Sequence, residues 1–289
     1  MTYTETTISQ RTTPTLGNNL QRLSRTLLAL ILLVTTIRLI GYIVRFIGES
    51  LQMDFAAFYT AGEALNAGFS PYRTHLQVDP PIWDGINEFL TSRFLYPPLV
   101  ATFFQPLARL DYAGAKMVWT LLGLLCLLLS LWLVNRHVHL ERSPTLLLIF
   151  AILVTTYYPL LTYLERGQID ALNLLLLTAA IFALLAAKRS TGVVAGILIA
   201  LATLFKLQCI YFVPFLLWRR QWWALAGYGM GAAALLAVSL AVNGPTALLG
   251  YLRVEMPRIA QYGDLGAADQ FIDRADWAAL HSGLPDGYT

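Results

Sequence analysis

Long apolar runs, separated by short charged turns, constrain the fold of this chain more than any other feature. The first run, residues 26–47, is about 22 residues long, and a helix of that length spans roughly 30 Å of hydrocarbon. Strands of a membrane β-barrel would alternate polar and apolar residues, and these runs do not alternate. The sequence therefore predicts an all-α integral membrane protein, a helical bundle of about seven spans. The further runs are residues 118–134, 145–164, 171–187, 191–205, 207–218 and 222–242.

The composition supports this class and excludes others. Of 289 residues, 57% are hydrophobic and 13% are charged, whereas soluble domains carry about 25% charged residues. The net charge of +3 is small and the basic residues are scattered at the ends of the runs, which argues against nucleic acid as a partner. The two cysteines lie in apolar runs, and the four histidines show no metal-ligand spacing. We therefore expect no cofactor, and a divalent metal ion stays an open alternative for which the sequence shows no motif.

Basic residues at the ends of the runs predict an orientation. Two arginines shortly before the first run place the N-terminus in the cytoplasm, because cytoplasmic loops are enriched in Lys and Arg. If the segment after Tyr96 does not cross the membrane, every later basic turn also faces the cytoplasm, while Lys206 and residues 165–170 face outside. An alternative joins residues 191–218 into one tilted span, with Lys206 buried at mid-membrane and the last basic turn outside. The basic turns are Arg136/Arg142, Lys188/Arg189 and Arg219/Arg220.

This arrangement divides the chain into three regions of a multi-pass plasma membrane protein. They are a disordered cytoplasmic tail (1–25), a membrane domain (26–245) and a polar extracytoplasmic tail of atypical composition (246–289). The outer loop, residues 48–117, is far longer than a usual connection of about 4–6 residues. Within this loop we expect a short helix that ends at Gly68. Residues 99–110 are expected to form an amphipathic helix in the outer interface.

Asp54 stands just beyond the first run, at the start of the outer loop. A carboxylate that is partly desolvated at a membrane surface gains proton affinity, as a general base requires. Asp54 is therefore the predicted catalytic base. The plainer interpretation is an interfacial acid that only solvates the start of a helix, and the sequence does not distinguish the two. Tyr59, Tyr72 and Tyr96 are predicted either to stack on a sugar ring or to form an interfacial aromatic belt.

The turn ERGQID, residues 165–170, joins two apolar runs through charged residues, where a plain outer loop would more often hold Gly, Ser or Asn. In this turn Arg166 is suited to bidentate pairing with a phosphate, and Gln168 to hydrogen bonding with a sugar. Asn173 follows one turn into the next run, on the side of Asp170, and is a further candidate for substrate binding. The plainer interpretation is a polar turn in which Asp170 caps the next helix.

Lys206 separates two short apolar runs. A lysine within the membrane costs about 2.5–3.5 kcal/mol on insertion scales, so it is a functional candidate by default. The plainer interpretation is that its long side chain reaches out to water at a loop. We predict that Lys206 binds the phosphate of a lipid-linked donor, with Arg166 as helper.

Together these motifs resemble glycosyltransferase family 87, the polyprenyl-phosphate-mannose-dependent α-mannosyltransferases of bacterial envelopes, within the GT-C superfamily. The resemblance rests on five motifs in order, between about residue 50 and residue 220. Family members usually have more spans than this chain, whose polar tail is also atypical. The motifs are the outer Asp54, Gly68-Phe-Ser-Pro71-Tyr72, Tyr96-Pro97-Pro98, Gly167-Gln168 with Asn173, and Lys206 in a broken run.

The resemblance implies a GT-C fold whose first outer loop carries juxtamembrane helices and the catalytic Asp54. It implies transfer of a hexose, above all mannose, from a polyprenyl-phosphate sugar to an envelope lipid or glycan on the outer face, with inversion at the anomeric carbon. Two alternatives stay open: a transporter or flippase with Lys206 in its substrate site, and an inactive truncated homologue. An outer site that gathers Asp54, Gln168 and Lys206 would favour the enzyme, and a site at the membrane midplane would favour transport.

Overall fold

The structure is a computed structural model, and it describes residues 16–48, 52–72, 94–139 and 143–257. Every regular element among these residues is helical, which confirms the all-α fold. The helices are α1 (Leu16–Gly48), α2 (Met53–Asn66), α3 (Pro98–Phe104), α4 (Tyr112–Val138), α5 (Pro144–Thr156), α6 (Tyr158–Arg166), α7 (Asp170–Leu185), α8 (Arg189–Phe205), α9 (Phe212–Trp218) and α10 (Trp222–Gly250). Short segments η3 (Leu107–Arg109) and η5 (Leu207–Tyr211) precede α4 and α9, and η6 (Tyr251–Glu255) extends α10. The predictions for residues 1–15 and for the polar tail beyond residue 257 lie outside the described residues.

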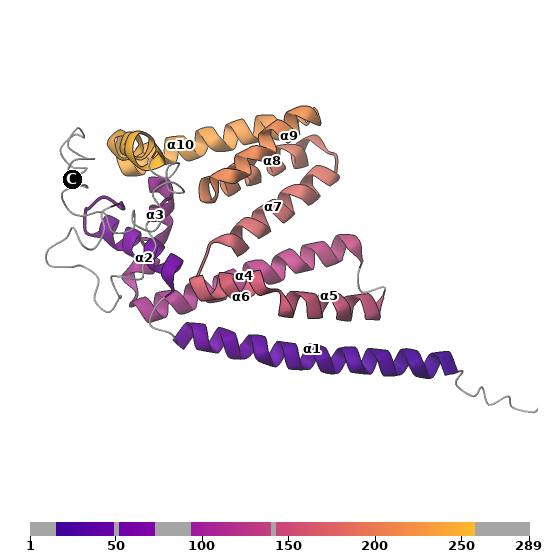
Figure 1. The fold of residues 1–289 in the computed structure, drawn as a ribbon. Coiled ribbons are helices and arrows are strands. Elements are labelled where there is room, and N and C mark those ends of the chain that lie inside the picture. Colours follow the sequence, from indigo (N-terminus) through magenta and orange to yellow (C-terminus); the bar gives the residue numbers. More distant parts are fainter. Residues whose placement is uncertain (1–15, 49–51, 73–93, 140–142, 258–289) are drawn as a thin grey trace, which may run out of the picture.

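The long helices pack side by side in one bundle (Figure 1). α1 packs along α5, α4 packs against α7, and α8 lies between α7 and α10. The small helices α2 and α3 lie together at one end of the bundle, where α3 contacts α10 and α2 contacts α4 and α6. Most of these contacts join helices that are not consecutive in the sequence.

The two ends of the bundle carry different sets of polar residues (Figure 1). The junction of α1 with α2, the turn between α6 and α7, and the break between α8 and η5 lie at the α2–α3 end. The starts of α1, α5, α8 and α10 lie at the opposite end. There Arg25 Nε donates to Thr145 Oγ1 at 3.2 Å, and the guanidinium of Arg189 stands 5.3 Å from the centre of the Trp223 ring. The predicted outer residues and the predicted cytoplasmic turns among the described residues are therefore at opposite ends.

Among the described residues, three helical segments, which begin with α1, α4 and α10, are by length and composition apolar enough to cross a membrane. The pair α5–α6, bent by 43°, becomes a fourth if it is counted as one broken span. The remaining apolar helices, α7, α8 and the η5–α9 segment, are shorter. The chain is thus an all-α membrane protein, and its predicted number of about seven spans stays a prediction.

The core at the α2–α3 end is aromatic. Phe58 of α2 stacks on Phe104 of α3, with ring centres 4.6 Å apart and planes inclined by 9°. Phe55 of α2 stacks on Trp119 of α4, with ring centres 6.2 Å apart. The three phenylalanines are almost completely buried. This packing fixes the first turns of α2, where Asp54 lies.

Near the N-terminus and in the outer loop, the structure differs from the sequence prediction. Residues 16–25, expected to belong to a disordered tail, form the first turns of α1, because their Leu, Arg and Gln residues are good helix formers. Residues 99–110 do not form one interfacial helix. Instead α3 ends at Phe104, and Pro106 precedes the separate turn η3. Most of α3 is buried against its neighbours and does not lie open to lipid.

The predicted C-terminal boundary of the membrane domain falls at a kink in α10. The sequence placed a boundary at residue 245, but α10 continues to Gly250. Gly244 kinks the helix there, with φ 77° and ψ 166°. Pro245 then opens the next helical turn, a position that suits its fixed φ and missing N–H. The Gly-Pro pair therefore separates two helical segments of α10 at a kink.

Candidate active site

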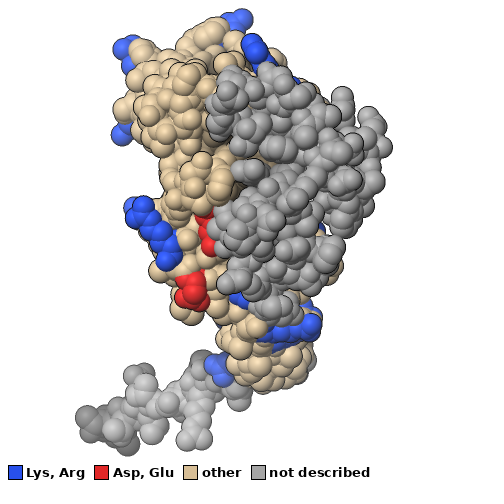
Figure 2. Space-filling model, turned by 90° about the vertical axis from the view of Figure 1, so that its left-hand side faces the viewer, with Lys and Arg blue, Asp and Glu red and all other residues tan. Residues whose placement is uncertain are grey.

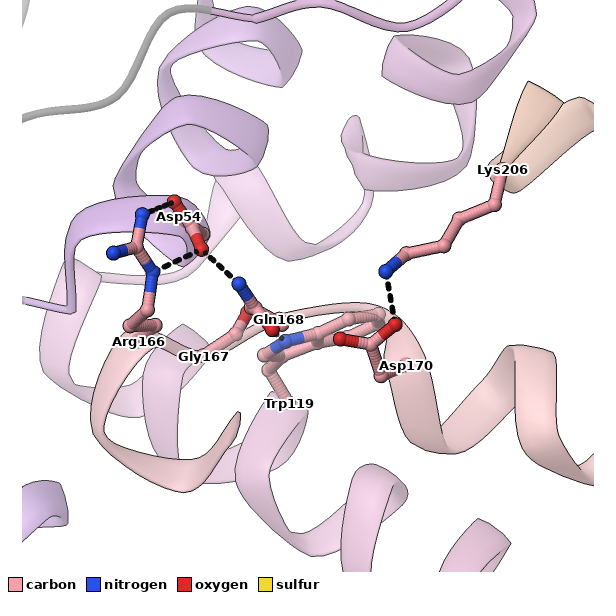
Figure 3. Close-up of polar contacts among 7 residues, drawn as sticks. All are labelled: Asp54, Trp119, Arg166, Gly167, Gln168, Asp170 and Lys206. Carbon is pink, nitrogen blue, oxygen red and sulfur yellow. Dashed lines mark hydrogen bonds and ion pairs between the residues drawn. The ribbon is translucent and has the colours of Figure 1, made fainter. Parts of the chain in front are cut away.

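Asp54 lies in the first turn of α2, and its carboxylate faces the turn between α6 and α7 (Figure 3). Arg166, the last residue of α6, donates from Nε to Oδ2 at 2.8 Å and from Nη2 to Oδ1 at 3.0 Å. Gln168 donates from Nε2 to Oδ2 at 2.8 Å. The Asp54 side chain is 15% exposed and the Arg166 side chain 38%. Three hydrogen bonds, two of them from a guanidinium fork, hold the carboxylate in one orientation.

Gly167 allows the turn to approach α2 this closely. Gly167 follows the last residue of α6 as its C-cap, and its φ of 67° lies in the left-handed region of backbone conformation. A Cβ added at this position would lie 2.6 Å from Phe55 Cβ and 2.7 Å from Gln52 Oε1. Both the backbone conformation and the lack of space therefore require glycine. The side chains on either side of Gly167 reach Asp54 as a result.

Two further side chains hold this arrangement together, and the sequence analysis missed both. Gln52 is 1% exposed, and its Nε2 donates to the carbonyl of Leu164 at 2.9 Å, which ties the start of α2 to the end of α6. Trp119 of α4 donates from Nε1 to the carbonyl of Gly167 at 2.9 Å (Figure 3). A single long-range contact leaves neither a periodicity nor a motif in the sequence, so no sequence signal points to either residue.

Asp170 and Lys206 form the second part of the site, an ion pair (Figure 3). Asp170 is the first residue of α7, and Lys206 is the single residue between α8 and η5. The backbone of Lys206 is extended, with φ −138° and ψ 106°, so the helix break expected at this residue is confirmed. Whether residues 191–218 cross the membrane once or twice stays a prediction. The N-cap of α7 is Ile169, which means that Asp170 does not cap the helix as the plainer interpretation proposed.

Tyr96 is electrostatically close to both parts of the site. Burial, and after it the negative charges of Asp54 and Asp170, raise the pKa of Tyr96 above its ordinary value. Its phenol therefore stays neutral at physiological pH.

The site lies at the end of the molecule shown in Figure 2, where acidic and basic side chains come to the surface close together among uncharged residues.

An apolar cavity of about 630 Å³ adjoins the ion pair, between α4, α5, α6 and α7. Asp170 and Asn173 are among its lining residues, and most of the others are leucines, valines or aromatic residues. Asn173 is 4% exposed, and its Nδ2 donates to Cys209 Sγ at 3.2 Å. Its Oδ1 is buried and has no hydrogen-bond partner within the part of the chain that the structure describes. A second cavity of about 540 Å³ shares Leu127, Leu131, Phe150, Val154 and Leu160 with the first.

Two predicted substrate contacts have a packing role in this structure. Tyr59 and Tyr72 are each 5% exposed. The hydroxyl of Tyr59 donates to the carbonyl of Leu110 at 2.8 Å, and that of Tyr72 donates to the carbonyl of Tyr96 at 2.7 Å. The Tyr72 ring also stacks on Tyr251, with centres 6.0 Å apart. Their predicted contact with a sugar stays a prediction.

A comparison with protein families covers most of these residues. The sequence model of glycosyltransferase family 87 matches residues 94–280, more than half of the chain. The chain belongs to glycosyltransferase family 87. The family 87 match includes the turn 165–170 and Lys206, begins after Asp54, and extends through most of the polar region that the sequence analysis called atypical. Neither a curated protein nor a solved structure matches the chain.

Membership in family 87 confirms the family that the motifs indicated and supports a membrane glycosyltransferase. The mannosyltransferase subtype and the GT-C fold stay predictions. Residues of the turn 165–170 and the start of α7 contact both Asp54 and Lys206. Gln168 donates a hydrogen bond to Asp54, and Asp170, which lies two residues after Gln168, forms the ion pair with Lys206. Among the described residues, no group of three or more His, Cys, Asp or Glu side chains is placed to hold a metal ion.

Proposed function

We propose that this family 87 protein moves a hexose, in the first instance mannose, from a polyprenyl-phosphate sugar to an envelope lipid or glycan. The observation that carries the proposal is the convergence of Arg166 and Gln168 on Asp54, beside Lys206, at one end of a membrane bundle. A site at one end of the bundle suits surface chemistry on a lipid-linked donor. A transporter would place its polar groups near the midplane.

Asp54 is the general base in this proposal. The acceptor hydroxyl gives its proton to the Asp54 carboxylate as its oxygen forms a bond to the anomeric carbon. The bond from that carbon to the phosphate oxygen breaks, and its electron pair leaves with the polyprenyl phosphate. Attack in line with the leaving group inverts the anomeric carbon, and phosphate leaves without an acid. Arg166 and Gln168 contribute by holding the carboxylate in one orientation toward the acceptor.

Lys206 provides positive charge for the donor phosphate. A cation at this point stabilises the phosphate in the bound donor and again as it gains charge on leaving, and only the second effect accelerates the reaction. Arg166 is engaged with Asp54, so it can assist at the phosphate only by loosening that contact. If Arg166 binds the donor phosphate, the Asp54 carboxylate therefore loses its contact with Arg166. Gln168 and the neutral hydroxyl of Tyr96 are suited to hydrogen bonding with the sugar.

The apolar cavity beside Asp170 provides a place for the isoprenoid chain of the donor. A chain in this cavity stays within the hydrocarbon layer while its phosphate reaches Lys206, because Asp170 belongs both to the cavity lining and to the ion pair. The helix ends that carry basic turns face the cytoplasm in our proposal, since cytoplasmic loops are enriched in Lys and Arg. The site then lies on the outer face of the plasma membrane.

Replacement of the base tests this function. Asp54→Asn keeps the shape of the side chain and removes its ability to take a proton, so the rate of transfer should fall by about 100- to 10,000-fold. The measurement is transfer of labelled mannose from polyprenyl-phosphate mannose in membranes with equal amounts of protein. Glu165→Gln is the matched control, because Glu165 is exposed beside Arg166 and loses the same charge. Asp54→Asn membranes that keep more than a tenth of the wild-type rate would remove Asp54 from the mechanism.

A further inference from the structure

A single lysine that holds the donor phosphate meets a difficulty when the reaction ends. The phosphate of the donor is a diester with one negative charge, whereas the released polyprenyl phosphate is a monoester with a charge of about −1.5 to −2 at pH 7. The product is therefore attracted to Lys206 more strongly than the donor. A site with no opposing charge would release its product slowly and would be inhibited by it.

Asp170 is placed to oppose this attraction. It is ion-paired with Lys206, the residue that the proposed function assigns to the phosphate. It stands at the start of α7, two residues after Gln168, and therefore on the same turn that holds Asp54. The pair is only half-buried, with side chains 39% and 31% exposed. An ion pair with this exposure is weak where its exposed side faces water, so an arriving phosphate can displace the carboxylate there.

The surroundings of the pair also suit a ligand with a charged head and an apolar chain. Asp170 lines the cavity of about 630 Å³, whose other lining residues are mostly apolar. Asn173, in the same lining, has a buried Oδ1 without a hydrogen-bond partner among the residues that the structure describes. A buried amide oxygen with no partner is costly, and a hydroxyl or a water brought in by a ligand would satisfy it.

We propose that the Asp170 carboxylate occupies Lys206 when no donor is bound. The phosphate of the lipid donor displaces this carboxylate from Lys206. After the reaction, the carboxylate returns to Lys206 and displaces the charged product. The inference rests on the proposed lipid-phosphate donor and concerns the regulation of the same site. Asp170 acts through Lys206 and touches no reacting atom, so it is a positioning residue. Its removal should strengthen phosphate binding. The effect should be larger for a monoester than for a diester, because the displaced carboxylate stays close and repels a charge of about −2 more than a charge of −1.

The test measures binding of farnesyl phosphate, and of its methyl diester as a donor-like monoanion, to the full chain in detergent at pH 7.5. Asp170→Asn should tighten binding of the monoester by about two- to fivefold, the range that an exposed ion pair supports, and should affect the diester less. Lys206→Met should weaken binding of both by roughly tenfold. Asp111→Asn is the control, because it removes an acid at the same end while asparagine still caps α4.

An Asp170→Asn protein that binds farnesyl phosphate as the wild type does, or more weakly, would overturn the proposal, because Asp170 would then merely orient Lys206. Asp170→Ala serves as a second neutral variant if the first does not fold. Inorganic phosphate is the second probe, and binding as tight as that of farnesyl phosphate would contradict a lipid ligand. The transfer assay is independent: loss of the proposed function would appear as no transfer by the wild type, whatever the binding data show.

Discussion

Gly167 is the residue on which the geometry of the site depends most directly. Its positive φ turns the chain between α6 and α7, and its missing side chain leaves room for Phe55 and Gln52. Gly68 has the same kind of backbone, with φ 80°, but an added Cβ there would meet nothing within 4 Å. The two glycines therefore separate the cost of the backbone conformation from the cost of the close contact.

We expect Gly167→Ala and Gly68→Ala to lower stability through the backbone by about 1–2 kcal/mol each. Only Gly167→Ala should also impair transfer, by about tenfold or more, because the turn must move away from α2 and a displacement of about 1 Å in a site can cost a hundredfold. Thermal unfolding and transfer of labelled mannose measure the two effects. Equal activity in the two variants would show that the close contact with α2 does not matter for the reaction.

The partner of Arg166 shows where prediction from the sequence stops at this scale. The sequence predicted that Asp54, Arg166 and Gln168 belong to one outer site, because charge in an outer turn is unusual. It did not identify the contact between them, since Asp54 and Arg166 are 112 residues apart. A guanidinium fork also fits a carboxylate as well as it fits a phosphate. Which anion Arg166 binds is decided by the packing of α2 on α6, which has no local signal.

Among the elements, α8 and α10 pack most closely. A Cβ at Gly196 of α8 would lie 1.9 Å from the carbonyl oxygen of Ala224, and a Cβ at Gly227 of α10 would lie 2.1 Å from that of Val193. Small residues at such positions let helices approach closely within a membrane. The apolar runs predicted both helices, but the sequence analysis did not identify this contact, because glycines are frequent in apolar helices for several reasons.

Gly196→Ala should therefore lower stability by about 1–3 kcal/mol, the usual cost of overfilling a packed contact. Gly229→Ala in α10 is the control, because nothing lies within 4 Å of its added Cβ. That variant should be neutral or more stable, since alanine favours a helix over glycine by about 1 kcal/mol. Thermal unfolding in detergent compares the two. A Gly196→Ala protein as stable as the Gly229→Ala protein would mean that α8 and α10 can separate without cost.

For the whole molecule, the apolar runs predicted a helical membrane protein, and the structure confirms it. Lys206 at a helix break and the turn 165–170 lie together at the α2–α3 end, as the charge pattern indicated. The count of spans could not be fixed in the same way. Helices α7, α8 and η5–α9 are shorter than a membrane span, and hydropathy alone does not decide how short helices cross a bilayer.

The central claim is that the molecule transfers a hexose from a lipid-phosphate donor on the outer face of the membrane. The most direct test supplies a short-chain polyprenyl-phosphate [14C]mannose, or the matching nucleotide sugar, to sealed right-side-out vesicles that contain the protein. We predict that label from the lipid-linked donor enters a lipid or glycan of the vesicle without permeabilisation, and that label from the nucleotide sugar does not. Transfer from the nucleotide sugar, or transfer from the lipid-linked donor only after permeabilisation, would contradict the account.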